Sequence, residues 1–151
     1  MRAVVQRVSS GTVNIPSKNY CASIEKGLVI LLGIKVDDSL EDALYLAEKC
    51  SNLRIFEDEN DKMNLSLKDV NGEVLIVSQF TLYGDSQKGN RPSFVEASRR
   101  ETAIPLYESF IKQMKTHIGE TKVKNGLFGE MMQVSLINEG PVTLIVESKQ
   151  V

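Results

Sequence analysis

Tryptophan is absent from the 151 residues, histidine occurs once and cysteine only twice. A catalytic Ser-His-Asp or Cys-His unit would have to use His117, and nothing in the sequence brings that residue near Ser78 or Cys50. His117 lies near the end of a helical pattern, where the ordinary role of a histidine is that of a helix-terminal cation or a partly exposed side chain. Cys21 and Cys50 show no CxxC or Cys/His spacing, so we expect two reduced thiols and neither a disulfide nor a zinc site.

The chain also lacks a basic excess and a long apolar run. Its formal net charge is −2 and its pI about 5.5, so any contact with nucleic acid must be local rather than a matter of bulk charge. No apolar run approaches the ~20 residues of a membrane span. Residues 1–8 alternate like a strand and contain no signal-peptide core, so we expect a cytoplasmic protein without membrane contact.

The common catalytic motifs are missing as well. There is no GxGxxG, no P-loop and no GxSxG elbow. The acidic pair Glu57 and Asp58 lies in a charged, turn-like stretch that is typical of solvated surface. No side chain is identifiable as a general base, and we expect neither a metal nor another cofactor.

Short apolar runs indicate strands rather than helices. They cover residues 3–8, 27–34, 73–81, 131–137 and 142–146, with a weaker strand over 11–15 pairing back on the first. Residues 28–32 lack polar alternation, which predicts a strand covered on both faces. Asn71-Gly72 predicts a tight turn before the strand at 73.

Two segments have helical spacing. In the first, Ser39 is a candidate N-cap, with Asp42 three residues on, and the expected buried face is Leu40, Ala43, Leu44, Ala47 and Cys50. The second spans about residues 98–116, with an apolar face of Ala103, Tyr107, Phe110, Ile111 and Met114. No linker or repeat divides the chain. We therefore predict one α/β domain of the α+β type over residues 1–151, with a mixed, largely antiparallel sheet and two main helices.

Three polar segments are candidates for function. Ser78-Gln79-Phe80-Thr81 ends a buried strand, and the polar loop 83–92 that follows is either functional or a solvated connection. Within it, Lys88 and Arg91 either solubilise the surface or bind a phosphate. Asn138-Glu139-Gly140-Pro141-Val142-Thr143 joins the last two predicted strands and, read alone, is an ordinary hairpin turn.

Together these segments resemble the D-aminoacyl-tRNA deacylase (D-tyrosyl-tRNA deacylase) family. The matching pieces follow the family's order along the whole chain and are residues 1–8, Arg54-Ile55-Phe56, Lys62-Met63-Asn64-Leu65, Ser78 to Leu82, Lys88 to Phe94, Gly126 to Met132 and Asn138 to Thr143. Glu130 departs from the pattern, since a small residue is common there, and 11–25 is a variable hairpin.

The resemblance implies a sheet curling toward a barrel, and a homodimer with two active sites at the subunit interface. It implies that Ser78, Gln79 and Phe80 line the pocket for the aminoacyl ester of an aminoacyl-tRNA acceptor end, with backbone N–H groups suited to an oxyanion. Thr81 and Thr143 stand where a nucleophile is naturally suspected. Phe128, Gly129 and Met131 resemble the pocket for the terminal adenosine.

In the same way, Gly140 and Pro141 of the other subunit would enter that pocket and exclude an L side chain, within the motif from Asn138 to Thr143 and anchored by Arg7. The Gly140–Pro141 bond should then be cis. The expected reaction is hydrolysis of D-aminoacyl-tRNA, and of mischarged glycyl-tRNA, with the ribose 2′-hydroxyl assisting in place of a side-chain nucleophile. Two alternatives remain at this point: a nonenzymatic nucleic-acid or nucleotide binding module, and a related deacylase that accepts certain L-amino acids.

Overall fold

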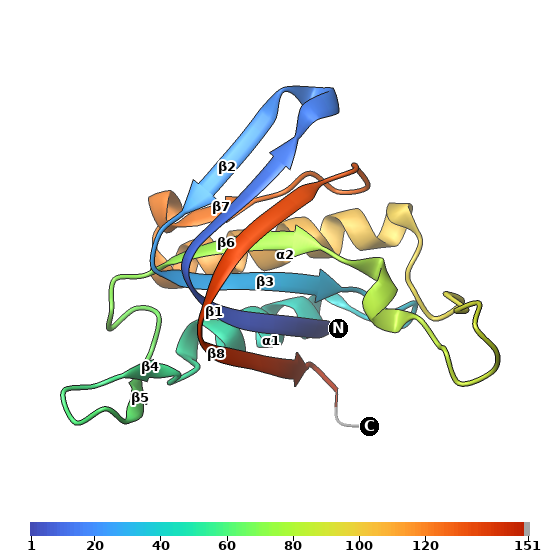
Figure 1. Cartoon of the computed structure of the whole chain (residues 1–151). Helices are drawn as coiled ribbons and strands as arrows, with labels where there is room; N and C mark the ends of the chain where they lie inside the picture. Colours follow the sequence, from blue (N-terminus) through green and yellow to red (C-terminus); the bar gives the residue numbers. More distant parts are fainter. Residues whose placement is uncertain (150–151) are drawn as a thin grey trace.

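Strand β1 (Arg2–Ile15) is the axis of the main sheet, in a computed structural model that describes residues 1–149 (Figure 1). Its first half pairs with β3 (Gly27–Gly33) and its second half with β2 (Tyr20–Ile24). Along its other side it pairs with β8 (Gln133–Glu147) over nearly its whole length. All three partners of β1 are antiparallel to it.

The sheet becomes parallel beyond β3. Strand β6 (Glu73–Ser78) runs parallel to β3, and β7 (Val123–Asn125) runs parallel to β6. The order is β2-β1-β3-β6-β7, and the Tyr20 hydroxyl donates a hydrogen bond of 2.6 Å from β2 to the Asn125 carbonyl of β7. This contact brings the two ends of the sheet together, so the predicted mixed sheet curling toward a barrel is confirmed.

Two helices pack against each other and cover one face of the sheet, as predicted (Figure 1). The helix α1 (Leu40–Asn52) begins after Ser39, whose N–H donates to the Asp42 carboxylate at 2.8 Å, and α2 (Arg100–Ile118) buries its whole predicted face. The predicted face of α1 is partly wrong. Leu40 and Leu44 are 53% and 36% exposed, because the helix is turned so that its buried side runs through Ala43, Leu46, Ala47 and Cys50.

The strand bounds differ from the predicted ones where the apolar pattern is interrupted. The runs 3–8 and 11–15 form one strand, β1, while β2 pairs back on it. The runs 131–137 and 142–146 likewise belong to one strand, except for residues 131 and 132, which precede it, so the motif between the runs is not a hairpin turn. The run 73–81 ends as a strand at Ser78 and continues as a short 3-10 helix, η2 (Phe80–Tyr83).

Several short elements were not predicted. They are η1 (Pro16–Lys18), η3 (Glu120–Lys122), β7, and a separate two-stranded sheet of β4 (Phe56–Glu57) and β5 (Met63–Leu65). The turn at Asn71-Gly72 is present, with the Gly72 N–H bonded to the Leu67 carbonyl at 2.9 Å. Among residues 1–149 no helix is long and apolar enough to cross a membrane.

The core has two parts, one on each face of β3. Leu28 and Ile30 belong to the cluster under the helices, whereas Val29 belongs to a second cluster inside the curled half of the sheet. All three side chains are fully buried, which confirms that this strand is covered on both faces. Because the neighbouring strand β6 is packed in the same way, its last residue, Ser78, is held rigidly at the rim between the two clusters.

Candidate active site

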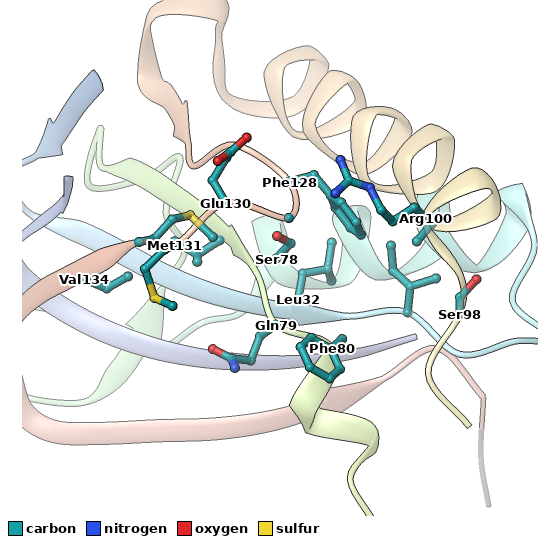
Figure 2. Close-up of a pocket in the computed structure, with 15 residues that line it drawn as sticks. Leu32, Ser78, Gln79, Phe80, Ser98, Arg100, Phe128, Glu130, Met131 and Val134 are labelled. Carbon is teal, nitrogen blue, oxygen red and sulfur yellow. The ribbon is translucent and has the colours of Figure 1, made fainter. Parts of the chain in front are cut away.

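A cavity of about 500 Å³ opens where the parallel strands β3 and β6 end (Figure 2). The carboxyl ends of parallel strands are a frequent place for ligand sites, because the strands stop there and leave a crevice between their loops. Its wall is mostly apolar, with a few polar side chains. The lining residues are Leu32, Ile34, Val77, Ser78, Gln79, Phe80, Ser98, Arg100, Ala103, Phe128, Gly129, Glu130, Met131, Met132 and Val134.

One wall is the end of β6. The Gln79 N–H donates to the Leu32 carbonyl at 2.8 Å and so completes the ladder to β3. That N–H is therefore not available to an oxyanion, whereas the N–H of Phe80 begins η2 and has no acceptor within the described residues. The Gln79 side-chain amide donates to the Thr81 hydroxyl.

The Phe80 ring marks the mouth of the cavity. It is 56% exposed and meets Phe94 edge to face, with ring centroids 5.1 Å apart. Phe94 follows the polar loop after β6, whose two sides are joined by hydrogen bonds of 2.8 Å between Asp85 and Ser93. Lys88 and Arg91 lie exposed between those two residues and do not line the cavity.

The opposite wall is the segment between β7 and β8. The Tyr107 hydroxyl of α2 lies 2.9 Å from the Gly126 carbonyl and 3.0 Å from the Ile76 carbonyl, so it ties this segment to β6. Phe128 packs edge to face on the Tyr107 ring, with centroids 5.7 Å apart. Phe128 is thereby fixed as a flat apolar surface in the cavity.

The remaining predicted residues gather at a bulge of β8. Gln6 faces Thr143 and Val8 faces Asn138, so Arg7 alone stands opposite residues 139–142. The Arg7 guanidinium is buried and donates to the Glu139 carbonyl at 2.9 Å and to the Ile55 carbonyl at 2.8 Å. Arg7 therefore joins the bulge to the segment before β4.

Asn138 closes the bulge from within β8. Its side-chain oxygen accepts from the Val142 N–H at 2.7 Å, and its amide donates to the Thr143 hydroxyl at 2.9 Å. Proline has no N–H for the ladder, which is why residues 140 and 141 are extruded from the strand. The Gly140–Pro141 bond is cis, as predicted, and both residues are exposed.

Apart from Lys88 and Arg91 in the exposed loop, the structure thus divides the predicted site residues into two groups. Ser78, Gln79, Phe80, Phe128, Gly129 and Met131 share the cavity, with Thr81 in η2 beside it. Arg7, Asn138, Gly140, Pro141 and Thr143 form the bulge, and none of them lines the cavity of the same chain. The two groups are separate within one chain.

Some lining residues were not predicted. Arg100 and Ser98 are an arginine and a serine at a helix start, a pattern that ordinarily means solvated surface. Val134 belongs to an apolar run that was assigned only to a strand. Two of these positions carried a signal in the sequence, because Met132 ends the matched segment that begins at Gly126 and Glu130 is a charged residue where small ones are common.

The cavity contains no nucleophile–base pair among its lining residues, which include neither histidine nor cysteine. His117 lies near the end of α2, with its Nε2 3.0 Å from the Gln113 amide nitrogen. Cys50 is fully buried in α1, and burial raises the pKa of its thiol to about 12, so it remains protonated and inert. What the cavity offers chemically is positioning, apolar surface and a free backbone N–H.

Fold and site together define a class of small α/β protein. A nearly closed mixed sheet presents an apolar pocket at the ends of two parallel strands, formed by main chain and apolar side chains rather than by a catalytic triad. The sequence profile of the D-Tyr-tRNA(Tyr) deacylase family matches residues 4–147. The chain belongs to this family.

Relatives of known name agree with this membership. The D-aminoacyl-tRNA deacylase of Flavobacterium psychrophilum is 56% identical, with 99% of this chain and 98% of the relative covered. The D-aminoacyl-tRNA deacylase of Thermosipho africanus is also 56% identical, with 100% and 99% covered. Among solved structures, the c-Myc DNA unwinding element binding protein is 39% identical and superposes with a TM-score of 0.92, covering 99% of this chain and 100% of that one.

Proposed function

We propose that the protein hydrolyses the ester bond of D-aminoacyl-tRNA and rejects the L form, as a proofreading enzyme of translation in the cytoplasm. The observation that carries the proposal is the cavity at the end of β6, where Ser78, Gln79 and Phe80 meet Phe128 and no side chain is placed as a base. An apolar pocket of about 500 Å³ suits an adenosine and an amino-acid side chain. Names of relatives at 56% identity support the same substrate.

In this proposal the substrate supplies the group that the protein lacks. Water adds to the ester carbonyl carbon, assisted by the 2′-hydroxyl of the terminal ribose, and the carbonyl oxygen becomes an oxyanion. The Phe80 N–H, which has no acceptor among residues 1–149, donates to that oxygen. The intermediate collapses with cleavage of the ester C–O bond. The ribose 3′-oxygen takes up the proton that the attacking water loses, which releases tRNA and the free D-amino acid.

The proposal also includes a second copy of the chain. The cavity and the bulge of β8 are separate within one chain, so a shared site needs Gly140 and Pro141 of a partner. Strand β8 pairs with β1 on one side only, and apolar side chains such as Ile137 and Ile145 are 62% and 70% exposed along it. A two-fold axis beside this strand would cover them and place each bulge at the other cavity.

Chiral selection then rests on main chain. A rigid backbone at Gly140-Pro141 would clash with an L side chain whatever its chemical nature, which requires no pocket tuned to each amino acid. Glycine has no side chain to exclude, so glycyl-tRNA should also be a substrate. Arg7 and Asn138, which fasten the bulge from two sides, would keep the wall in place.

The decisive experiment compares D-Tyr-tRNA with L-Tyr-tRNA and follows release of the amino acid. We expect the D form to react at least about a hundredfold faster, equivalent to ~3 kcal/mol of discrimination. Equal rates would refute the assignment of chirality. Preferential hydrolysis of L forms would instead support the alternative of a related deacylase that accepts certain L-amino acids.

A second experiment tests the role of the ribose. A tRNA ending in 2′-deoxyadenosine and charged on the 3′-oxygen should be nearly inert, because the assisting hydroxyl is missing. The variants Thr81→Ala, Thr143→Val and His117→Ala should retain measurable activity, since none of these side chains has a base placed to activate it. Full turnover of the deoxy substrate, or complete loss in one of these variants, would exclude the ribose-assisted route.

A second candidate function is binding of DNA, favoured by the name of the solved structure that is 39% identical. The net charge of −2 makes strong nonspecific binding of a phosphate backbone unfavourable. Titration of duplex DNA at several salt concentrations distinguishes the two functions. Tight, steeply salt-dependent binding by a protein that leaves D-Tyr-tRNA intact would favour the binding module.

A further inference from the structure

Arg100 is the cationic side chain of the cavity, and no acidic side chain within residues 1–149 pairs with it. It is exposed and lines the cavity together with Phe128 and Gly129. Across residues 1–149 its guanidinium forms no ion pair and donates no hydrogen bond, whereas Glu130 on the same rim is paired with Lys18 at 3.6 Å. The positive charge of Arg100 is therefore available to a ligand in the cavity.

A glycine leaves room for the Arg100 guanidinium. Gly129 has φ +78°, and a Cβ at residue 129 would lie only 2.7 Å from the Arg100 Nη1 and 3.0 Å from its Cζ. The missing side chain therefore leaves the space in which the guanidinium lies against the main chain of residue 129. Figure 2 shows the side chain reaching from the start of α2 to the segment that carries Phe128.

Helix stability does not explain this arginine. Arg99 is the N-cap of α2 without a side-chain capping bond, and Arg100 is the first helical residue. Cations at the start of a helix oppose its dipole and destabilise it slightly, and Ser, Thr, Asp or Asn would cap it better. A planar guanidinium with several donors in a fixed geometry is, in contrast, well suited to binding a phosphate.

We propose that Arg100 is a substrate-binding residue whose guanidinium binds the phosphate on the 5′ side of the terminal adenosine. The inference rests on the proposed function, because it takes the cavity beside Phe128 as the site of that adenosine. Arg100 lines the cavity against Gly129. In the proposed pose the nucleoside would direct its 5′-oxygen toward Arg100, and the phosphate contact would add binding energy without altering the position of the ester.

Paired substrates with and without that phosphate test the inference. The substrates are D-tyrosyl-tRNA, 3′-O-(D-tyrosyl)adenosine and the 5′-monophosphate of that nucleoside ester. For Arg100→Ala we expect KM to rise about tenfold on tRNA and on the 5′-monophosphate, the usual magnitude for one charge-assisted contact. On the ester without phosphate we expect no change, and kcat should stay within about twofold on all three substrates. Arg100→Lys should recover part of the loss.

Arg99→Ala is the matched control, because it removes the neighbouring arginine, which does not line the cavity. It should leave the preference for the phosphate unchanged. An equal loss on both nucleoside esters in Arg100→Ala, or no loss on either, would overturn the inference.

Binding separates this inference from the proposed function. Calorimetry with the unreactive 3′-amide analogues, with and without the 5′-phosphate, reports the phosphate contact without hydrolysis. A gain in affinity from the phosphate that disappears in Arg100→Ala supports the inference even for a protein that does not cleave D-Tyr-tRNA. A phosphate gain of the same size in the variant and in the wild type contradicts it, whatever the catalytic result.

Discussion

At the scale of the residue, Gly140 combines a backbone conformation that favours glycine with close neighbours. Its φ is +146°, and an added Cβ would lie 2.9 Å from the Val142 backbone nitrogen and 2.7 Å from the Val142 side chain. Gly89 also has a positive φ, +71°, but open space around it. We expect Gly89→Ala to cost about 1 kcal/mol of unfolding free energy from backbone conformation alone, and Gly140→Ala to cost more because of the added clash. Urea denaturation of both variants measures the difference, and equal costs would contradict it.

Individual residues also set the limit of what the sequence predicts. Ser78, Phe80, Phe128 and Gly129 were identified before the structure was known, because each stands in a motif that the family shares. Arg100 was not identified, since an arginine at a helix start is ordinary on a surface. Its proximity to Gly129 arises only when α2 packs beside the segment before β8.

At the scale of the element, the bulge of β8 depends on a side chain from another strand. Removal of the Arg7 guanidinium leaves the buried Ile55 carbonyl and the partly buried Glu139 carbonyl without their donor. Arg7→Ala should therefore lower the unfolding free energy by about 3 kcal/mol, whereas Arg54→Ala, at an exposed position, should have little effect. The Arg7→Ala protein that still folds should discriminate D from L substrates less well than the wild type. Unchanged stability together with unchanged discrimination would show that the bulge holds its shape without Arg7.

Elements differ in how well their patterns predict them. Helix α2 and strand β3 were predicted well, because continuous apolar periodicity follows from the way each is buried. Strand β8 was predicted as two strands, because the apolar periodicity stops at the four residues of the bulge, whereas the pairing with β1 resumes on both sides of it. A local sequence pattern indicates which face of a strand is buried. At a bulge the side chains no longer alternate between the two faces, so the pattern is lost there.

At the scale of the whole molecule, a cluster of charged and polar side chains connects α1 with residues 148 and 149, which follow β8. Burial raises the pKa of the Asp42 carboxyl, but hydrogen bonds from the Ser39 backbone, Ser148, the Ser39 hydroxyl and Lys149 outweigh it and hold that pKa at about 2. Because this lies below the ordinary 3.8, Asp42 stabilises the fold above about pH 4, and the contribution is lost as the pH falls toward 2.

The unfolding free energies at neutral and at acidic pH should therefore differ less in Asp42→Asn than in the wild type. The unfolding free energy of wild type and variant, measured by denaturant at a series of pH values, should differ most above about pH 4 and converge below it. Asp61→Asn, at an exposed turn, is the control. A difference between Asp42→Asn and wild type that is the same at every pH would contradict the role of the carboxylate charge.

The proposed formation of a dimer also concerns the whole molecule. Analytical ultracentrifugation should show a dimer, and activity should fall on dilution below the concentration at which it dissociates, because each cavity then loses its partner's bulge. Ile145→Lys, on the exposed face of β8, should shift the equilibrium toward monomer while leaving the fold intact. Full activity of a monomer at nanomolar concentration would exclude the shared site.

The pairing of β1 with β8 has a consequence for synthesis on the ribosome. The amino-terminal half of the sheet emerges first, and β1 can pair at once with β2 and β3. Its other edge stays open until β8 has also left the exit tunnel. During that interval the nascent chain exposes an unpaired strand to other chains, a situation in which chaperones are recruited. Arg7 meets the Glu139 carbonyl only after that point, so the bulge forms only once the last strand of the sheet has been translated.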